Sequence, residues 1–143
     1  MSHLVKKACA LNDLQTLLDA ARVLGWTIEQ GGKAKFFSGY SEECDFVMTP
    51  VNEVNDRGEG LAYTIGIKQD QTGAISLLYD NAMNSRDVLY GDDEDTCTQR
   101  ILGKLKQSYQ VVAAKKVAQK KGWRVKEQMR ADGKVVLKIQ GMR

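Results

Sequence analysis

The sequence predicts an α+β fold, in which residues 1–143 form a single domain with an antiparallel sheet of about five to seven strands and helices mainly on one face. Three observations support this prediction. Apolar residues switch along the chain between helical spacing and strict alternation. The expected strands follow one another as hairpins and not as βαβ units. A unit of helix, strand, turn and strand occurs twice, each time with a tryptophan directly after a glycine.

The first unit is expected at residues 12–37. Asn12 can cap a helix, with Gln15 three residues later. The apolar face of this helix consists of Leu14, Leu17, Leu18, Ala21 and Leu24. Gly25 suits the left-handed position that ends a helix, and Trp26 begins a strand by packing its ring back under that helix. "QGGK" then supplies a turn and "KAKFF" a return strand.

The middle of the chain is expected to add three strands, at residues 46–50, 61–70 and 74–81. Between the first two lies "VNEVNDRGEG", which has the composition of a surface loop. A second loop, residues 81–96, has an acidic end that would favour the positive N-terminus of the next helix.

That helical region, residues 96–121, contains a discontinuity in its apolar pattern. One face consists of Ile101, Leu102, Leu105, Tyr109 and Val112. A later set lies on nearly the opposite side: Val111, Ala114, Val117 and Ala118. We therefore expect a break, a kink or two separate helices near residues 107–110.

The second unit closes the chain. Gly122 suits a helix end and Trp123 begins a strand whose ring, like that of Trp26, would enter the core. The Asp132-Gly133 pair predicts a tight hairpin turn, after which residues 135–139 return.

Charge is distributed very unevenly along the chain. Residues 100–143 hold 13 Lys and Arg against two acidic residues, a net charge of +11, whereas residues 1–99 have a net charge of −8. This pattern indicates either a basic surface for phosphates or an acidic partner, or two segments that lie side by side and neutralise each other. The similar size of the two excesses favours the second interpretation. The candidate binding surface is the outer face of the last two strands, with Arg124, Lys126, Arg130 and Lys138.

Cysteine usage and hydropathy indicate a cytoplasmic protein. Cys9, Cys44 and Cys97 form no Cys-x-x-Cys pair, and their odd number predicts reduced thiols that serve as small buried apolar residues. No apolar run reaches the roughly 18 residues of a membrane span. The N-terminus lacks the pattern of a signal peptide.

No set of residues predicts catalysis, a metal or a cofactor. The acidic clusters at residues 41–45 and 91–96 lack the spacing of a calcium loop and are expected in loops and helix caps. His3 is the only histidine and offers a single imidazole. A nucleotide-binding glycine motif is absent.

Three stretches of the sequence resemble a known family: "MSHLVKKACALNDLQTLLDAARVLGW", "GIKQDQTGAISLLYD" and "SYQVVAAKKVAQKKGWRVKEQMRADGKVVLKIQ". They look like the small conserved plastid reading frame family of red-algal chloroplasts and cyanobacteria, a domain of unknown function. The resemblance covers almost the whole chain, with a weaker match at residues 36–59, and it implies no catalytic residues. Relatives often lie in genomes near an AAA-type ATPase and ferredoxin-like proteins, which implies an accessory role with a protein partner such as an AAA-type ATPase system.

Three functions follow as hypotheses. The leading one is a small, soluble, non-catalytic accessory or adaptor protein that binds another macromolecule. The alternative is nucleic-acid or phosphate binding through the basic segment, residues 100–143. The third, an enzyme acting on a small anionic substrate, would need a concave pocket with titratable residues.

Overall fold

The computed structural model describes residues 4–8, 13–36, 41–55, 58–61, 63–80, 96–131 and 135–140. Its elements, in chain order, are β1 (Leu4–Ala8), α1 (Leu14–Val23), β2 (Thr27–Gln30), β3 (Lys33–Lys35), β4 (Ser41–Glu43), β5 (Phe46–Thr49), β6 (Ile65–Gln69), β7 (Ile75–Asp80), α2 (Thr96–Lys120), β8 (Arg124–Met129) and β9 (Val135–Gln140). Neither described helix is both long and apolar enough to cross a membrane.

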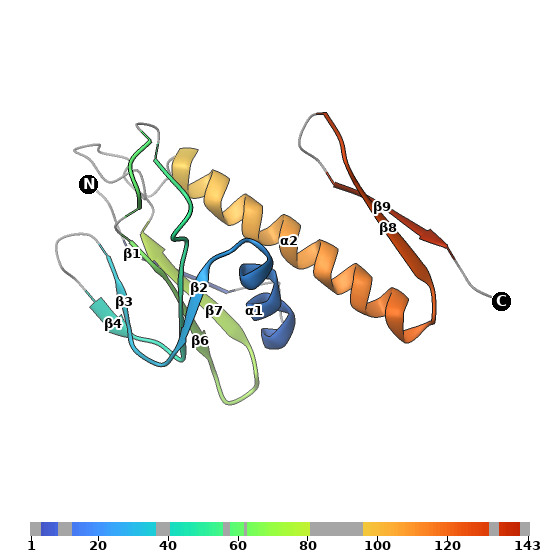
Figure 1. Cartoon of the computed structure of the whole chain (residues 1–143). Coiled ribbons are helices and arrows are strands. Elements are labelled where there is room, and N and C mark those ends of the chain that lie inside the picture. The colour runs from blue at the N-terminus through green and yellow to red at the C-terminus, as the bar shows by residue number, and fades with distance from the viewer. Residues whose placement is uncertain are drawn as a thin grey trace.

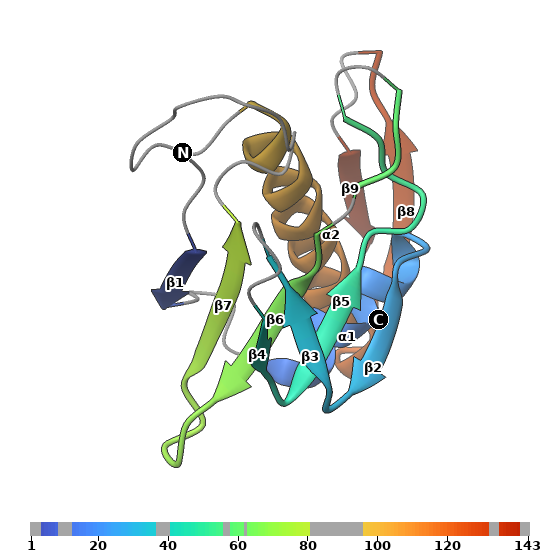
Figure 2. The same cartoon turned by 90° about the vertical axis from the view of Figure 1, so that its left-hand side faces the viewer.

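The main sheet has five antiparallel strands in the order β1-β7-β6-β5-β2, and both helices lie on one of its faces (Figures 1 and 2). Two shorter antiparallel sheets, β3–β4 and β8–β9, accompany it. The predicted α+β class, the antiparallel sheet and the single helical layer are therefore confirmed. The expected strands at residues 46–50, 61–70 and 74–81 correspond to β5, β6 and β7.

Strand alternation gives the main sheet two buried faces. Ile65 and Ile67 of β6 point toward the helices and belong to the larger core, together with Leu17 of α1 and Ile101 of α2. Between the two isoleucines, Gly66 faces the other side, where Ala34, Phe36, Cys44, Val47 and Leu78 form a second, smaller core. The β3–β4 ribbon thus covers part of the sheet face that the helices leave open (Figure 2).

The first helix–strand–turn–strand unit has the expected order but not the expected pairing. β2 pairs with β5, whereas β3 pairs with β4 in a separate sheet. Gly31 and Gly32 both have positive φ, 73° and 99°, so the chain turns out of the main sheet between the two strands instead of folding back beside β2. Of the two predicted units, only the second has its two strands, β8 and β9, paired with each other.

The limits of α1 match the sequence pattern except at its first turn. Asp13, and not Asn12, is the N-cap, because its carboxylate accepts from the N–H of Thr16. At the other end Gly25 has φ 79° and ends the helix as expected. Trp26 is buried in the core, 3% exposed.

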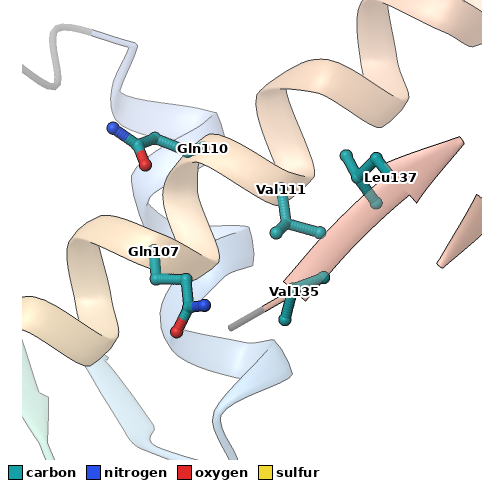
Figure 3. Close-up of a pocket in the computed structure, with 5 residues that line it drawn as sticks. All are labelled: Gln107, Gln110, Val111, Val135 and Leu137. Atoms are coloured by element: carbon teal, nitrogen blue, oxygen red, sulfur yellow. The ribbon is translucent and has the colours of Figure 1, made fainter. Parts of the chain in front are cut away.

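α2 is one continuous helix of 25 residues, drawn without a sharp bend in Figure 1, so the predicted break, kink or pair of helices near residues 107–110 is wrong. The apolar pattern changes sides because the helix has two packing partners. Ile101 and Leu105 face α1 and the main sheet, while Val111 faces the β8–β9 ribbon on the far side of the helix (Figures 1 and 3). Val117 does not join the second set, since it is 52% exposed.

Several predicted features lie outside the described residues. They are His3, Cys9, the potential cap Asn12, residues 91–95 of the second acidic cluster and the turn at Asp132-Gly133.

Candidate functional site

The predicted binding surface lies on the β8–β9 ribbon, which sits on the side of α2 opposite the main sheet (Figure 1). Arg124 and Lys126 alternate along β8, and Lys138 of β9 is directly opposite Lys126 in the register. All three side chains are exposed. Because they share one face of the pleat, the ribbon brings together three of the four predicted residues, and we call them the basic face. Arg130, the fourth, is exposed just beyond the end of β8.

The inner face of the ribbon fixes the direction of the basic face. Lys115 of α2 forms an ion pair with Glu127, which alternates with Lys126 along β8. Leu137, opposite Glu127 in the register, also faces α2. Residues with the opposite parity must therefore point away from the helix.

The connection between α2 and β8 is a tight helix stop. Gly122 has φ 70°, as expected for a helix-ending glycine, and the N–H of Trp123 donates to the carbonyl of Ala118 at 2.8 Å. Trp123 is only partly buried, with the Nζ of Lys121 4.6 Å from its ring centre. The expectation of two equivalent core tryptophans is therefore wrong, because a two-stranded ribbon on one helix cannot enclose an indole as the main core encloses Trp26.

Three of the six positive charges of α2, those of Arg100, Lys104 and Lys116, are matched by acidic residues from the N-terminal part of the chain. Lys116 Nζ lies 2.9 Å from Asp19 of α1, and this hydrogen bond holds the pKa of Asp19 below its ordinary value. Lys104 Nζ lies 2.7 Å from Glu53. By contrast, within the described residues no carboxylate forms an ion pair with Arg124, Lys126 or Lys138. The two interpretations of the charge pattern thus apply to different places: neutralisation at α2, and an open basic surface on the ribbon.

Glu53 is a buried acid that the sequence analysis assigned to a surface loop. Its side chain is 8% exposed and accepts from Lys104 and, at 3.4 Å, from Trp26 Nε1. In the same loop Asn52 donates to the carbonyl of Leu24 at the end of α1. Arg100 of α2 reaches the same loop, where it donates to a backbone carbonyl. The loop therefore joins the end of α1 to α2, and no periodicity in its sequence signals this role.

A groove of about 280 Å³ lies between α2 and β9 (Figure 3). Its lining residues are Gln107, Gln110, Val111, Val135 and Leu137. Val111 is on the side of α2 that faces Val135 and Leu137. None of these side chains titrates or acts as a nucleophile, so the groove can hold apolar groups and donate or accept hydrogen bonds through the amide of Gln107, but it carries no acid–base chemistry (Figure 3).

The acidic cluster at residues 41–45 is engaged in structural contacts. Glu42 forms an ion pair with Lys68 at 2.7 Å, and Asp45 accepts from the N–H of Gln69. Across the described part of the chain, no group of three or more His, Cys, Asp or Glu side chains could hold a metal ion.

Within the described residues Cys44 and Cys97 form no disulfide, and they are buried in different cores, as the sequence predicts for structural cysteines. Burial raises the pKa of the Cys44 thiol, which keeps it protonated at neutral pH.

The fold and the surface define an α+β protein whose C-terminal ribbon carries a basic face and borders an apolar groove. Comparisons of the chain with protein-family models, curated proteins and solved structures find no match.

Proposed function

We propose that this protein is a non-catalytic accessory protein that binds an acidic protein partner through the basic face. The observation that carries the proposal is the position of Arg124, Lys126 and Lys138 on one exposed face with no described carboxylate to pair with. Cations arranged in this way attract an acidic partner and set the orientation in which it binds.

The contrast with α2 supports a binding role for the ribbon. Lys104 and Lys116 already have carboxylate partners within 3 Å, so their charges serve the fold. The basic face has no such structural duty, and replacing its charges should leave the core intact. The resemblance to the plastid and cyanobacterial family favours an AAA-type ATPase system as the partner. Cys44 and Cys97, which form no disulfide, favour the cytoplasm as the location.

The test is affinity purification of the tagged protein from its own host at low salt, with and without nuclease. The variant Arg124→Glu/Lys126→Glu/Lys138→Glu should lose the partner. A matched control is Lys106→Glu/Lys120→Glu, which reverses exposed charges on α2 and should retain it. A partner that survives nuclease and is retained equally by both variants would refute the assignment of the surface.

Nucleic-acid binding is the second candidate, because Arg124 and Lys126 are about 7 Å apart along an extended strand and could contact successive phosphates. In that case the affinity for a mixed-sequence duplex should fall with salt with a log–log slope of about −3 for three contacts. Loss of all bound material after nuclease treatment would favour this function. A flat salt response would exclude it.

A further inference from the structure

The groove between α2 and β9 lies beside an unpaired strand edge. In the described part of the chain β9 pairs with β8 on one side only, and the strand residues that line the groove, Val135 and Leu137, both belong to β9. An unpaired edge presents backbone N–H and C=O groups that can accept another strand. A partner strand could therefore form backbone hydrogen bonds with the edge and apolar contacts with the groove at the same place.

A strand added to β9 would be well placed to fill the groove. It would lie about 4.8 Å beyond β9, and alternate side chains would point toward α2. Those side chains would meet Val111, Val135 and Leu137, while the amide of Gln107 could bind polar groups at the margin. The inward positions of such a strand should thus be apolar.

The same apolar band continues onto β8. Met129 is directly opposite Val135 in the register, on the inner face of the ribbon, yet its side chain is 76% exposed. Its side chain extends the apolar surface of Val135 from the groove toward β8.

The outward positions of an added strand would face the charge of the ribbon. Lys138 projects from β9 on the face opposite the groove, with Lys126 behind it on β8. Cross-strand neighbours on one face interact most favourably when their charges are opposite. The outward positions should thus be acidic.

We propose that the edge of β9 binds an extended partner segment in which apolar and acidic residues alternate, by β-strand addition. The apolar side chains enter the groove against α2, and the acidic side chains lie beside Lys138, with Lys126 one strand farther away on β8. This inference rests on the proposed function, since it identifies the kind of segment through which the acidic partner binds.

The test uses the full chain and the peptide acetyl-Glu-Val-Glu-Leu-Glu-Val-Glu-amide as the probe, followed by ¹⁵N–¹H NMR titration. We expect saturable shifts at the backbone amides of residues 135–138 and at the side-chain amide of Gln107. Two N-methylated peptides, modified either at the glutamates or at the apolar residues, remove N–H donors from opposite edges of the strand. One of the two should bind at least about tenfold more weakly, because it loses the hydrogen bonds to β9.

Two variants test the apolar part and the charged part of the contact separately. Val111→Glu places a carboxylate in the groove and Lys138→Glu reverses the outward charge, and each should weaken peptide binding by about tenfold or more. The matched control Val117→Glu changes an exposed valine of α2 outside the groove and should bind the peptide as the wild type does. Lys138→Glu is on the surface and keeps the test valid if Val111→Glu disturbs the packing of the ribbon.

The outcomes separate this inference from the proposed function. If the peptide shifts the amides of Arg124 and Lys126 but not those of residues 135–137 or the side-chain amide of Gln107, and neither N-methylated peptide binds more weakly, strand addition is refuted while binding by the basic face is supported. If the wild type does not bind the peptide at low salt, strand addition is again refuted. The purification with the charge-reversed variants then decides the proposed function independently.

Discussion

The carboxylate of Glu53 and the ammonium of Lys104 are 2.7 Å apart, and this pair joins the loop after β5 to the first half of α2. The two partners differ in environment, since the side chain of Glu53 is 8% exposed and that of Lys104 is 44% exposed. Loss of the lysine leaves a carboxylate inside the protein, whereas loss of the carboxylate leaves a lysine that water can reach. The contact between this loop and α2 should therefore depend on the pairing of the buried Glu53 carboxylate with positive charge.

Glu53→Gln should lower the free energy of unfolding by about 1–3 kcal/mol, because it removes the charge that Lys104 and Arg100 surround while its amide oxygen can still accept from Trp26. Urea denaturation measures the change. Glu29→Gln, at an exposed position of β2, is the control and should alter stability by less than about 0.5 kcal/mol. Equal stability of Glu53→Gln and the wild type would show that the pair is not a structural link.

The two tryptophans should differ in their contribution to stability. Trp26 lies in the main core and its replacement by alanine should cost about 3–5 kcal/mol. Trp123 is partly buried at the start of β8, and Trp123→Ala should cost about 1 kcal/mol, typical of a single substitution. Thermal and urea unfolding of the two variants provide the comparison.

Fluorescence gives an independent check of the same difference. In Trp26→Phe the remaining indole of Trp123 should be quenched readily by acrylamide, whereas in Trp123→Phe the remaining indole of Trp26 should be protected. Equal quenching in the two variants would contradict the unequal burial of the rings.

Gly66 should not tolerate even one added methyl group. A Cβ at this position would lie 2.4 Å from Cys44 Sγ and 3.1 Å from the Cβ of Ala34, beneath the β3–β4 ribbon. Gly66→Ala should cost about 1–3 kcal/mol through overpacking, measured by urea denaturation.

Two further variants test the physical cause at Gly66. Adding Cys44→Ala should recover part of the loss, because it removes the nearest atom. Gly103→Ala, in α2 where a Cβ would meet nothing within 4 Å, should instead stabilise the protein by about 0.5–1 kcal/mol. Additive effects of Gly66→Ala and Cys44→Ala would exclude the steric explanation.

Periodicity was sufficient to predict the elements and their buried faces, since these depend on residues close in sequence. Leu17 and Leu18 of α1 are buried as their spacing predicts, and Arg124 and Lys126 share an exposed face as alternation predicts. The helix ends at Gly25 and Gly122 were also predicted correctly, because glycine, which has no Cβ, adopts a positive φ at little cost.

What sequence periodicity does not contain is the choice of distant partners. β2 pairs with β5, sixteen or more residues away in the chain, and nothing in the "QGGK" turn indicates that the chain leaves the sheet there. The apolar residues of α2 change sides because the helix packs against the β8–β9 ribbon as well as against the main core. A helix break would give the same sequence pattern, so periodicity alone does not distinguish the two. Glu53 was missed for a related reason, since its burial depends on Lys104, which is 51 residues away.

The ion pair between Asp19 of α1 and Lys116 of α2 should make stability depend on pH in the acid range. Lys116 lowers the pKa of Asp19, with smaller contributions from Gln15 and Arg22. A carboxyl whose pKa is lower in the folded than in the unfolded state stabilises the fold at pH values above the unfolded pKa of about 3.9, and this contribution is lost as the pH falls toward the folded pKa. Because both side chains are partly exposed, the contribution should be about 0.2–1 kcal/mol.

Asp19→Asn should therefore be less stable than the wild type at pH 7, and the difference should vanish when urea denaturation is repeated below the folded pKa of Asp19. Lys116→Met should abolish most of the same pH dependence, and NMR titration of the Asp19 carboxyl carbon should show a higher pKa in that variant than in the wild type. Since the pair is at the surface, molar salt should reduce the difference at pH 7. An unchanged Asp19 pKa in Lys116→Met would mean that Gln15 and Arg22, and not the contact between the two helices, stabilise the carboxylate.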